Sequence, residues 1–162
     1  MSAQAIIQVS KTFFEPIVKK RESCRGLVVE NGKVLFSYES HKDIYMSPGG
    51  GVEGEESLQE CCARELLEET GLVVDVGEHF ITIKEYVFNE LYISHYFLCS
   101  VKGEGEKQLT PTEAAHGMVP RWVELERAVE IFSKYLEKTP DHESLYLREY
   151  TVLNEYKKVN EK

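Results

Sequence analysis

A dense group of glutamates between residues 53 and 69 has a spacing that suits a divalent cation. This window contains seven glutamates and one arginine, and it carries six of the chain's nine net negative charges. At about 100° per helical residue, Glu65, Glu68 and Glu69 share one narrow arc. Carboxylates at this spacing repel one another, and the helix dipole disfavours anions near the C-terminal end. Mg²⁺ or Mn²⁺ would relieve that repulsion, because these ions prefer hard oxygen ligands on a rigid element.

The alternative is an acidic helix face that contacts only water, which is the usual meaning of a run of charge. The residues before the helix favour the cation site. Gly49, Gly50 and Gly51 come just before the acidic window, and a glycine-rich loop brings backbone N–H groups close to phosphate oxygens. Phosphoryl transfer needs charge neutralisation and alignment more than covalent help. The pattern therefore predicts a site for a phosphate-bearing anion that binds together with cations.

The glutamates need a helix to hold them, and the sequence marks both of its ends. Ser57 followed by Glu60 is a capping box, which predicts that the helix starts at Ser57. Gly71 is predicted to terminate it, because glycine readily adopts the left-handed conformation that follows a helix. Asn31-Gly32 joins two β-branched runs, 25–30 and 33–38, and predicts a hairpin with a type I′ turn.

The rest of the chain alternates between strand and helix patterns. We predict strands at 72–76, 80–87, 91–101 and 120–123, and helices at about 126–137 and 144–157 with a break at 139–141. Residues 102–119 are predicted as a loop that is too long to be a simple connector. These patterns indicate an α/β layered fold in a single domain over residues 1–162, with 1–20 as its N-terminal extension.

Composition excludes several classes of function. The net charge of −9 has the wrong sign for a protein that binds nucleic acid through phosphates or attaches to membranes through basic residues. No apolar run approaches the roughly 18 residues of a membrane span, and no secretory signal opens the sequence. The cysteines, Cys24, Cys61, Cys62 and Cys99, lack a metal-binding spacing and suit reduced thiols. We therefore expect a cytoplasmic protein that binds a small molecule, with no nucleic-acid or membrane partner.

The glycines and glutamates together resemble the Nudix box. Its fixed positions are matched, in order and spacing, by Gly50, Glu56, Arg64-Glu65-Leu66, Glu68-Glu69 and Gly71-Leu72. Nine constrained positions would coincide by chance at about one start site in a billion. The resemblance implies the family fold, an α/β/α sandwich with a mixed β-sheet, in which the box forms a loop, a helix and a second loop.

The resemblance also implies a reaction and assigns roles within the box. The family hydrolyses a nucleoside diphosphate linked to a further group, with a metal-activated water attacking phosphorus. By this resemblance the catalytic residues would be Arg64, which orients a carboxylate, and the ligands of Mg²⁺ or Mn²⁺, Glu65, Glu68 and Glu69. The substrate-binding residues would be Gly50 and Gly51, which lie against the phosphates, and Glu56, which supports their loop.

The identity of the general base is open between the box and the loop at 102–119. Relatives use either a box glutamate or a glutamate from a distal loop. Among the loop glutamates, Glu104, Glu106 and Glu113, we favour Glu113, and the alternative is that it is an ordinary solvated residue. The loop is also predicted to form a flap over the diphosphate. His95 is interpreted as a core histidine rather than a substrate contact, and His116 as a loop residue.

These observations predict a metal-dependent pyrophosphohydrolase that cleaves a nucleoside di- or triphosphate derivative. The alternative from another class is a Nudix-fold module that binds a nucleotide without cleaving it, and the intact box carboxylates favour the enzyme. An RNA-processing relative is disfavoured because the sequence has no basic stripe. A nucleoside triphosphate and a nucleotide sugar both stay open as substrates, and so does a homodimer.

Overall fold

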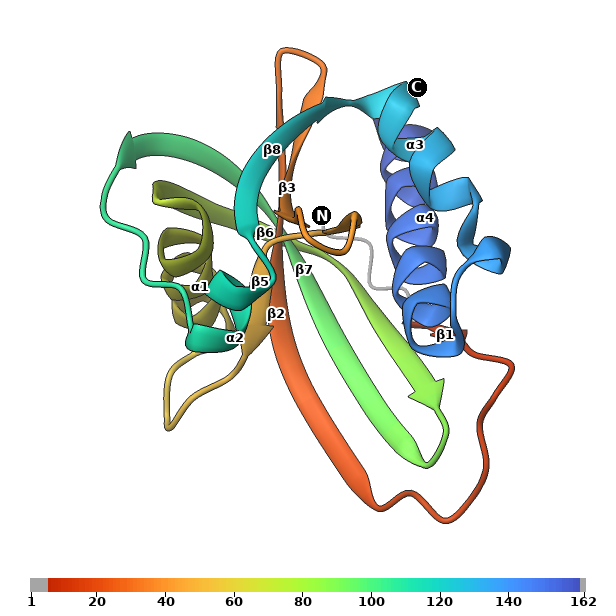
Figure 1. Cartoon of the computed structure of the whole chain (residues 1–162). Coiled ribbons are helices and arrows are strands. Elements are labelled where there is room, and N and C mark those ends of the chain that lie inside the picture. The colour runs from red at the N-terminus through yellow and green to blue at the C-terminus, as the bar shows by residue number, and fades with distance from the viewer. Residues whose placement is uncertain (1–5, 161–162) are drawn as a thin grey trace.

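The computed structural model describes residues 6–160, and their strands form one eight-stranded mixed sheet (Figure 1). The order across the sheet is β1-β6-β7-β2-β3-β4, while β5 pairs with β2 and β8 pairs with β3. The β1–β6 and β2–β7 pairs are parallel, and the others are antiparallel. The strands are β1 (Ile6–Val9), β2 (Lys19–Glu30), β3 (Lys33–Glu39), β4 (Ile44–Met46), β5 (Gly49–Gly51), β6 (Leu72–Val87), β7 (Glu90–Glu104) and β8 (Met118–Glu124).

Helices cover both faces of the sheet, with α1 on one side and α3 and α4 on the other (Figure 1). The helical elements are α1 (Leu58–Thr70), α2 (Pro111–Ala115), α3 (Leu125–Ser133), the short 3₁₀ helix η1 (Tyr135–Glu137) and α4 (Pro140–Asn160). Leu66 of α1 packs with Phe97 in one apolar cluster, and Phe132 and Tyr146 pack with Tyr96 in another. The predicted sandwich of a mixed sheet between helices is confirmed. Within residues 6–160 no helix is both long and apolar enough to cross a bilayer.

The local signals at the hairpin and at the first helix are confirmed. Asn31 and Gly32 have φ values of 53° and 77°, as a type I′ turn requires, and they join β2 to β3. The Ser57 hydroxyl accepts from the Glu60 N–H and the Glu60 carboxylate accepts from the Ser57 N–H, so the capping box is complete. Gly71 ends α1 in the left-handed region with φ of 76°. The glutamate-bearing helix therefore starts and stops where its caps predict.

Several predicted boundaries are wrong. The strand expected at 25–30 begins at Lys19. The strands expected at 72–76 and 80–87 form the single strand β6, whose pairing with β7 is irregular between Val76 and Ile81. The helix expected over 126–137 ends at Ser133 and is followed by η1. Helix α4 starts at Pro140 rather than after it, because proline lacks only an N–H that the first turn of a helix does not use.

The segment 102–119 is not one long loop. Strand β7 continues to Glu104, helix α2 occupies the middle of the segment, and β8 begins at Met118. The Gln108 N–H donates to the Glu68 carbonyl at 2.8 Å and the Gly105 N–H donates to the Gly71 carbonyl at 2.8 Å, so the segment is attached to the end of α1. These bonds bring α2 close to the glutamates.

The N-terminal residues that the structure describes join the sheet. Strand β1 pairs in parallel with β6, and the Phe14 and Val18 N–H groups bond to carbonyls of Phe88 and Asn89 at the β6–β7 turn. The predicted N-terminal extension over 1–20 thus packs on the same sheet from residue 6 onward. Residues 1–5 and 161–162 lie outside the described residues, and the prediction of a single domain over 1–162 stays a prediction.

Candidate active site

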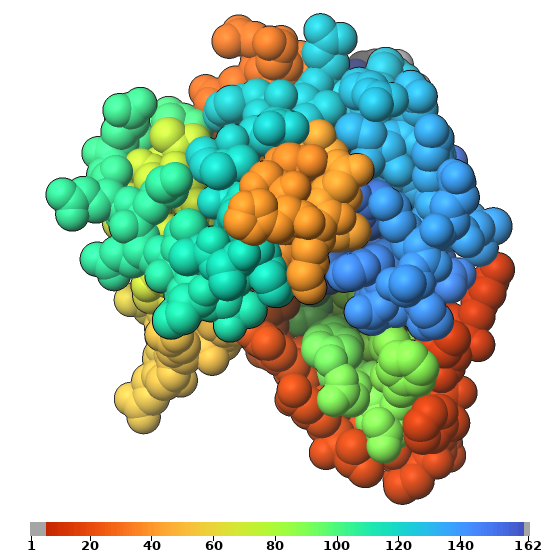
Figure 2. Space-filling view, in the orientation of Figure 1, coloured from red at the N-terminus to blue at the C-terminus, as the bar shows by residue number. Residues whose placement is uncertain are grey.

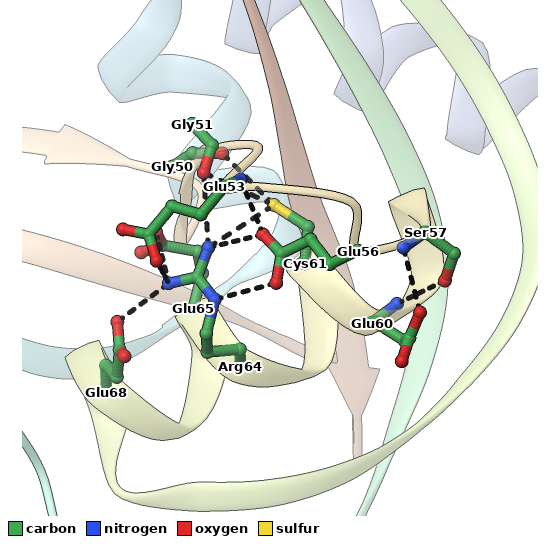
Figure 3. A network of polar contacts seen from close by, with 10 residues as sticks. All are labelled: Gly50, Gly51, Glu53, Glu56, Ser57, Glu60, Cys61, Arg64, Glu65 and Glu68. Carbon is green, nitrogen blue, oxygen red and sulfur yellow. Dashed lines mark hydrogen bonds and ion pairs between the residues drawn. The ribbon is translucent and has the colours of Figure 1, made fainter.

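Arg64 is at the centre of the polar network on α1 (Figure 3). Its Nε and Nη2 donate to the two oxygens of Glu56 at 3.0 and 2.7 Å, in a two-pronged pair. Nη2 also donates to the Gly51 carbonyl at 3.2 Å. The hydrogen bonds from Arg64 lower the pKa of Glu56 to about 2, so that carboxylate stays charged. Arg64 therefore fastens the loop that follows β5 onto the helix.

The remaining nitrogen of Arg64 reaches the glutamates nearer the end of the helix. Nη1 donates to Glu65 Oε1 and to Glu68 Oε2, both at 3.0 Å. Burial raises the pKa of Glu65, against the opposing effect of Arg64. Arg64 therefore contacts both carboxylates, and its predicted role of orienting a carboxylate stays a prediction.

Glu69 points into the protein and is only 3% exposed. The Ser37 hydroxyl of β3 donates to Glu69 Oε1 at 2.8 Å, and the Gly49 N–H donates to the same oxygen at 3.3 Å. Burial raises the pKa of Glu69 to about 8, and the charges of Glu113 and Glu65 act in the same direction. Sequence reasoning missed Ser37, although a hydroxyl within the apolar run of β3 signals a buried polar partner.

The glycine run permits close packing around Glu65. A Cβ atom on Gly50 would lie 2.6 Å from the Glu65 carboxylate, and one on Gly49 would lie 2.6 Å from Cγ of Arg25. Contacts this short do not occur between real side-chain atoms, so larger residues would displace both groups. The glycines therefore let the backbone of β5 lie directly against charged side chains.

One cleft of about 970 Å³ joins these groups. Its lining includes the box glutamates 65, 68 and 69, the glycines of β5 and residues of α2 and α4. Figure 2 shows this face hollowed below the orange β3–β4 turn, between the blue start of α4 and the red-orange strand β2. The predicted ligands and phosphate-binding glycines therefore share one accessible space.

The structure places Glu113 in the same cleft. Glu113 is the third residue of α2, where its carboxylate accepts from the Thr110 N–H at 2.9 Å. Its charge contributes to the raised pKa of Glu69, so the two carboxylates lie within electrostatic range of each other. Glu104 and Glu106 are not among the residues that line the cleft.

The end of α2 is held by contacts that the sequence did not reveal. His116 forms a hydrogen bond with Glu39 of β3, and both side chains line the cleft. The Ser40 hydroxyl donates to the Gly117 carbonyl at 2.7 Å. The interpretation of His116 as a mere loop residue is therefore incomplete, since it anchors α2 to the sheet.

His95 lies on the sheet and does not line the cleft. Its Nδ1 is 3.0 Å from the Thr82 hydroxyl, and its Nε2 is 3.5 Å from Glu22 Oε2. The partly buried side chain thus has protein partners, in line with a structural histidine.

A family model described as the NUDIX domain matches residues 20–148, which contain α1 and the strands from β2 to β8 except for Lys19, the first residue of β2. The chain belongs to the NUDIX family.

Two curated relatives are similar over part of this NUDIX chain. The 8-oxo-dGTP diphosphatase of Buchnera aphidicola is 38% identical over 64 residues, which is 40% of this chain and 51% of that protein. Phosphatase NudJ of Escherichia coli is 32% identical over 109 residues, which is 64% of this chain and 63% of that protein. The chain thus spans between half and two thirds of the length of these relatives.

Solved structures agree with the NUDIX fold. The NUDIX hydrolase from Nitrosomonas europaea superposes with a TM-score of 0.65 at 20% identity, over 86% of this chain and 89% of that one. At this identity the likeness concerns the fold alone. Hydrolases of the NUDIX family generally use divalent cations and act on small nucleotide derivatives.

Proposed function

We propose that the chain is a metal-dependent pyrophosphohydrolase that cleaves a nucleoside di- or triphosphate derivative by attack of water on phosphorus. The observation that carries this proposal is the meeting of Glu65, Glu68 and Glu69 with the β5 glycines in one cleft. The names of the two relatives, a diphosphatase and a phosphatase, support the same class of reaction. A screen of phosphate release from nucleoside diphosphate derivatives, with Mg²⁺ or Mn²⁺ present, tests it directly.

The donor set on α1 suits Mg²⁺ or Mn²⁺. As the side chains lie, no three His, Cys, Asp or Glu groups within residues 6–160 surround a common point that would hold a metal ion. Glu65 and Glu69 are nevertheless carboxylates whose pKa is raised by burial, and a cation beside them would favour their charged forms. We therefore assign Glu65, Glu68 and Glu69 as its ligands. A bound divalent cation would neutralise diphosphate charge and lower the pKa of a water ligand.

The other residues of the site would hold the substrate and move the proton. The backbone of Gly50 and Gly51 would contact the phosphates, while Glu56 and Arg64 keep the loop in place. The attacking water needs a carboxylate within hydrogen-bond reach. Glu113 lines the same cleft as Glu69 and is our first candidate for that base, with the box glutamates as the alternative.

Millimolar Mg²⁺ or Mn²⁺ should raise the Tm of the metal-free protein. A ligand that binds only the folded state stabilises it by mass action, and a hundredfold excess over Kd should raise Tm by about 5–10 °C. The Glu65→Gln/Glu68→Gln double variant should lose this response in a thermal melt. The Glu104→Gln/Glu106→Gln double variant removes the same charge outside the cleft and should keep it. An equal rise in both variants would place the cation elsewhere.

Glu113→Gln should separate chemistry from binding. If Glu113 takes the proton from water, kcat should fall about a hundredfold or more, the usual effect of a lost general base. KM should change little, because the box would still hold the substrate. Glu106→Gln, a neighbouring change outside the cleft, should leave both constants near wild type. A kcat for Glu113→Gln within a small factor of wild type would return the base to Glu65 or Glu69.

The alternative function is a module that binds a nucleotide without cleaving it. Its discriminating result would be saturable nucleotide binding with no phosphate release under any metal condition. The chain's homodimerisation and its cytoplasmic location stay predictions.

A further inference from the structure

The cleft continues away from the box along the sheet, and we call this part the outer arm. Its floor is formed by Arg21 and Ser23 of β2 and by Tyr92 and Ser94 of β7. These residues lie opposite each other in the parallel pairing of the two strands, and the two serine hydroxyls are 3.3 Å apart. Leu145 of α4 also lines the cleft. The floor of the outer arm is therefore formed by paired strands next to the box rather than by loops.

Arg21 lies where the outer arm meets the glycine run. A Cβ atom on Gly51 would be 3.2 Å from Nη2 of Arg21 and 3.3 Å from its Nε. The guanidinium thus rests on the backbone that we assign to the substrate phosphates. Arg21 therefore lies close to any group that continues from a diphosphate at Gly50 and Gly51 into the outer arm.

Three acidic residues of the outer arm are hydrogen-bonded to other groups of the protein, namely Glu85 to Arg148 and Ser144, Glu90 to Tyr92, and Asp141 to Thr139. A fourth, Glu22, is half exposed, and its Oε2 lies 3.5 Å from Nε2 of His95. No hydrogen bond or ion pair joins the side chain of Arg21 to another of the residues 6–160, although its charge acts on Tyr92, the residue opposite it on β7. In a chain of net charge −9, the outer arm thus presents a guanidinium without an acidic partner.

We propose that Arg21 determines substrate specificity by binding a phosphate group beyond the pair held at the box. This inference rests on the proposed function and narrows its substrate to nucleoside triphosphates, in preference to a nucleoside diphosphate joined to a neutral sugar. A guanidinium forms two parallel hydrogen bonds to a phosphate, and Arg21 has its donors uncommitted. A neutral sugar would leave that charge unpaired beside the bound substrate.

Steady-state kinetics on two substrates of the same nucleoside test the assignment. Arg21→Gln should lower kcat/KM for the triphosphate by about tenfold to a hundredfold, mainly through KM. The value for the nucleotide sugar should stay within about threefold of wild type, since no phosphate of that substrate reaches Arg21. Lys19→Gln removes one positive charge from the same strand outside the cleft and should leave the ratio of the two values unchanged. Equal losses for both substrates, or no loss for either, would overturn the assignment.

A binding measurement separates this inference from the proposed function. With Mg²⁺ present, inorganic tripolyphosphate should raise the Tm of the wild-type protein more than pyrophosphate does, because an additional phosphate reaches Arg21. In Arg21→Gln the two ligands should give the same rise. This result is expected even if the protein hydrolyses no nucleotide, in which case only the proposed reaction fails. Identical behaviour of wild type and Arg21→Gln would refute the phosphate contact while leaving the reaction intact.

Discussion

Glu69→Gln should remove most hydrolysis while the protein remains folded. The change takes away the buried carboxylate between Ser37 and the cleft, and loss of one preorganised charge at a reacting phosphate lowers kcat by about two to three orders of magnitude. Folding of the metal-free protein should tolerate the amide, because without a cation burial raises the pKa of Glu69 to about 8 and favours an uncharged side chain at neutral pH. Phosphate release and a thermal melt on the same sample measure both effects.

Removal of the metal from the wild-type protein should have the same effect on hydrolysis as Glu69→Gln. Excess EDTA should abolish hydrolysis, and added Mg²⁺ or Mn²⁺ should restore it. Glu60→Gln is a suitable control, because Glu60 lies on the same helix outside the cleft and glutamine also completes a capping box. Full activity in EDTA, or a Glu69→Gln enzyme as fast as the Glu60→Gln control, would exclude the metal site on α1.

Arg148→Met should be the most destabilising single change outside the box. Arg148 Nη1 donates to Glu85 Oε1 at 2.7 Å and Nη2 donates to Glu149 Oε2 at 3.2 Å, and all three side chains are at most 5% exposed. Removing one partner of a buried ion pair leaves an uncompensated charge and costs about 3–5 kcal/mol of unfolding free energy. Urea denaturation measures this loss, and a variant that no longer unfolds cooperatively would also demonstrate it.

The control for this change is an exposed ion pair. Arg127 and Glu130 are more than half exposed, so Arg127→Met should alter the unfolding free energy by less than about 1 kcal/mol. A similarly small effect of Arg148→Met would mean that water enters the buried network and solvates its carboxylates.

The stability difference between wild type and Arg148→Met should depend on pH. Burial acts to raise the pKa of Glu149, but Arg148, Arg25 and hydrogen bonds from Ser47 outweigh it and hold the pKa below 4.5, the ordinary value. A carboxyl with a lowered pKa in the folded state stabilises above its unfolded pKa, and this contribution is lost as pH falls through the folded pKa. The gap between the two proteins should therefore narrow as pH falls below about 5.

The parts of the fold that follow from local chemistry were predictable. The capping box, the glycine after α1 and the Asn31-Gly32 turn each act over a few residues, and each lies where its local pattern predicts. Helix α2 also had such a signal, because Thr110 and Glu113 form a capping box with Pro111 at the first helical position, and the prediction of a loop over 102–119 did not use it. The irregular pairing in β6 and the attachment of the segment 102–119 to α1 were not predictable, because both depend on bonds to distant segments. Gln108, for example, bonds to a carbonyl at the end of α1.

The same distinction between local signals and distant contacts applies to the residues of the candidate site. Helical spacing alone brings Glu65, Glu68 and Glu69 together, so the proposed ligands could be named from the sequence. Their surroundings could not, since Ser37 lies 32 positions from Glu69 and meets it only in the folded sheet. Arg21 carries no signal in its own neighbourhood. Its place beside Gly51 results from the pairing of β5 with β2.

The long parallel pairing of β2 with β7 has a consequence for the order of events during synthesis. Lys19 through Val28 lie opposite Glu90 through Cys99, and Ser23 and Ser94 in this pairing are 71 positions apart. The β2–β3 hairpin can form as soon as both strands have left the ribosome. The edge of β2 that pairs with β7 stays unpaired until β7 has been synthesised. Contacts of such separation slow folding and keep strand edges exposed meanwhile. The nascent chain should therefore depend on chaperones until β7 has been made. The β2–β7 pairing forms the floor of the outer arm, so the outer arm should be completed after the box helix.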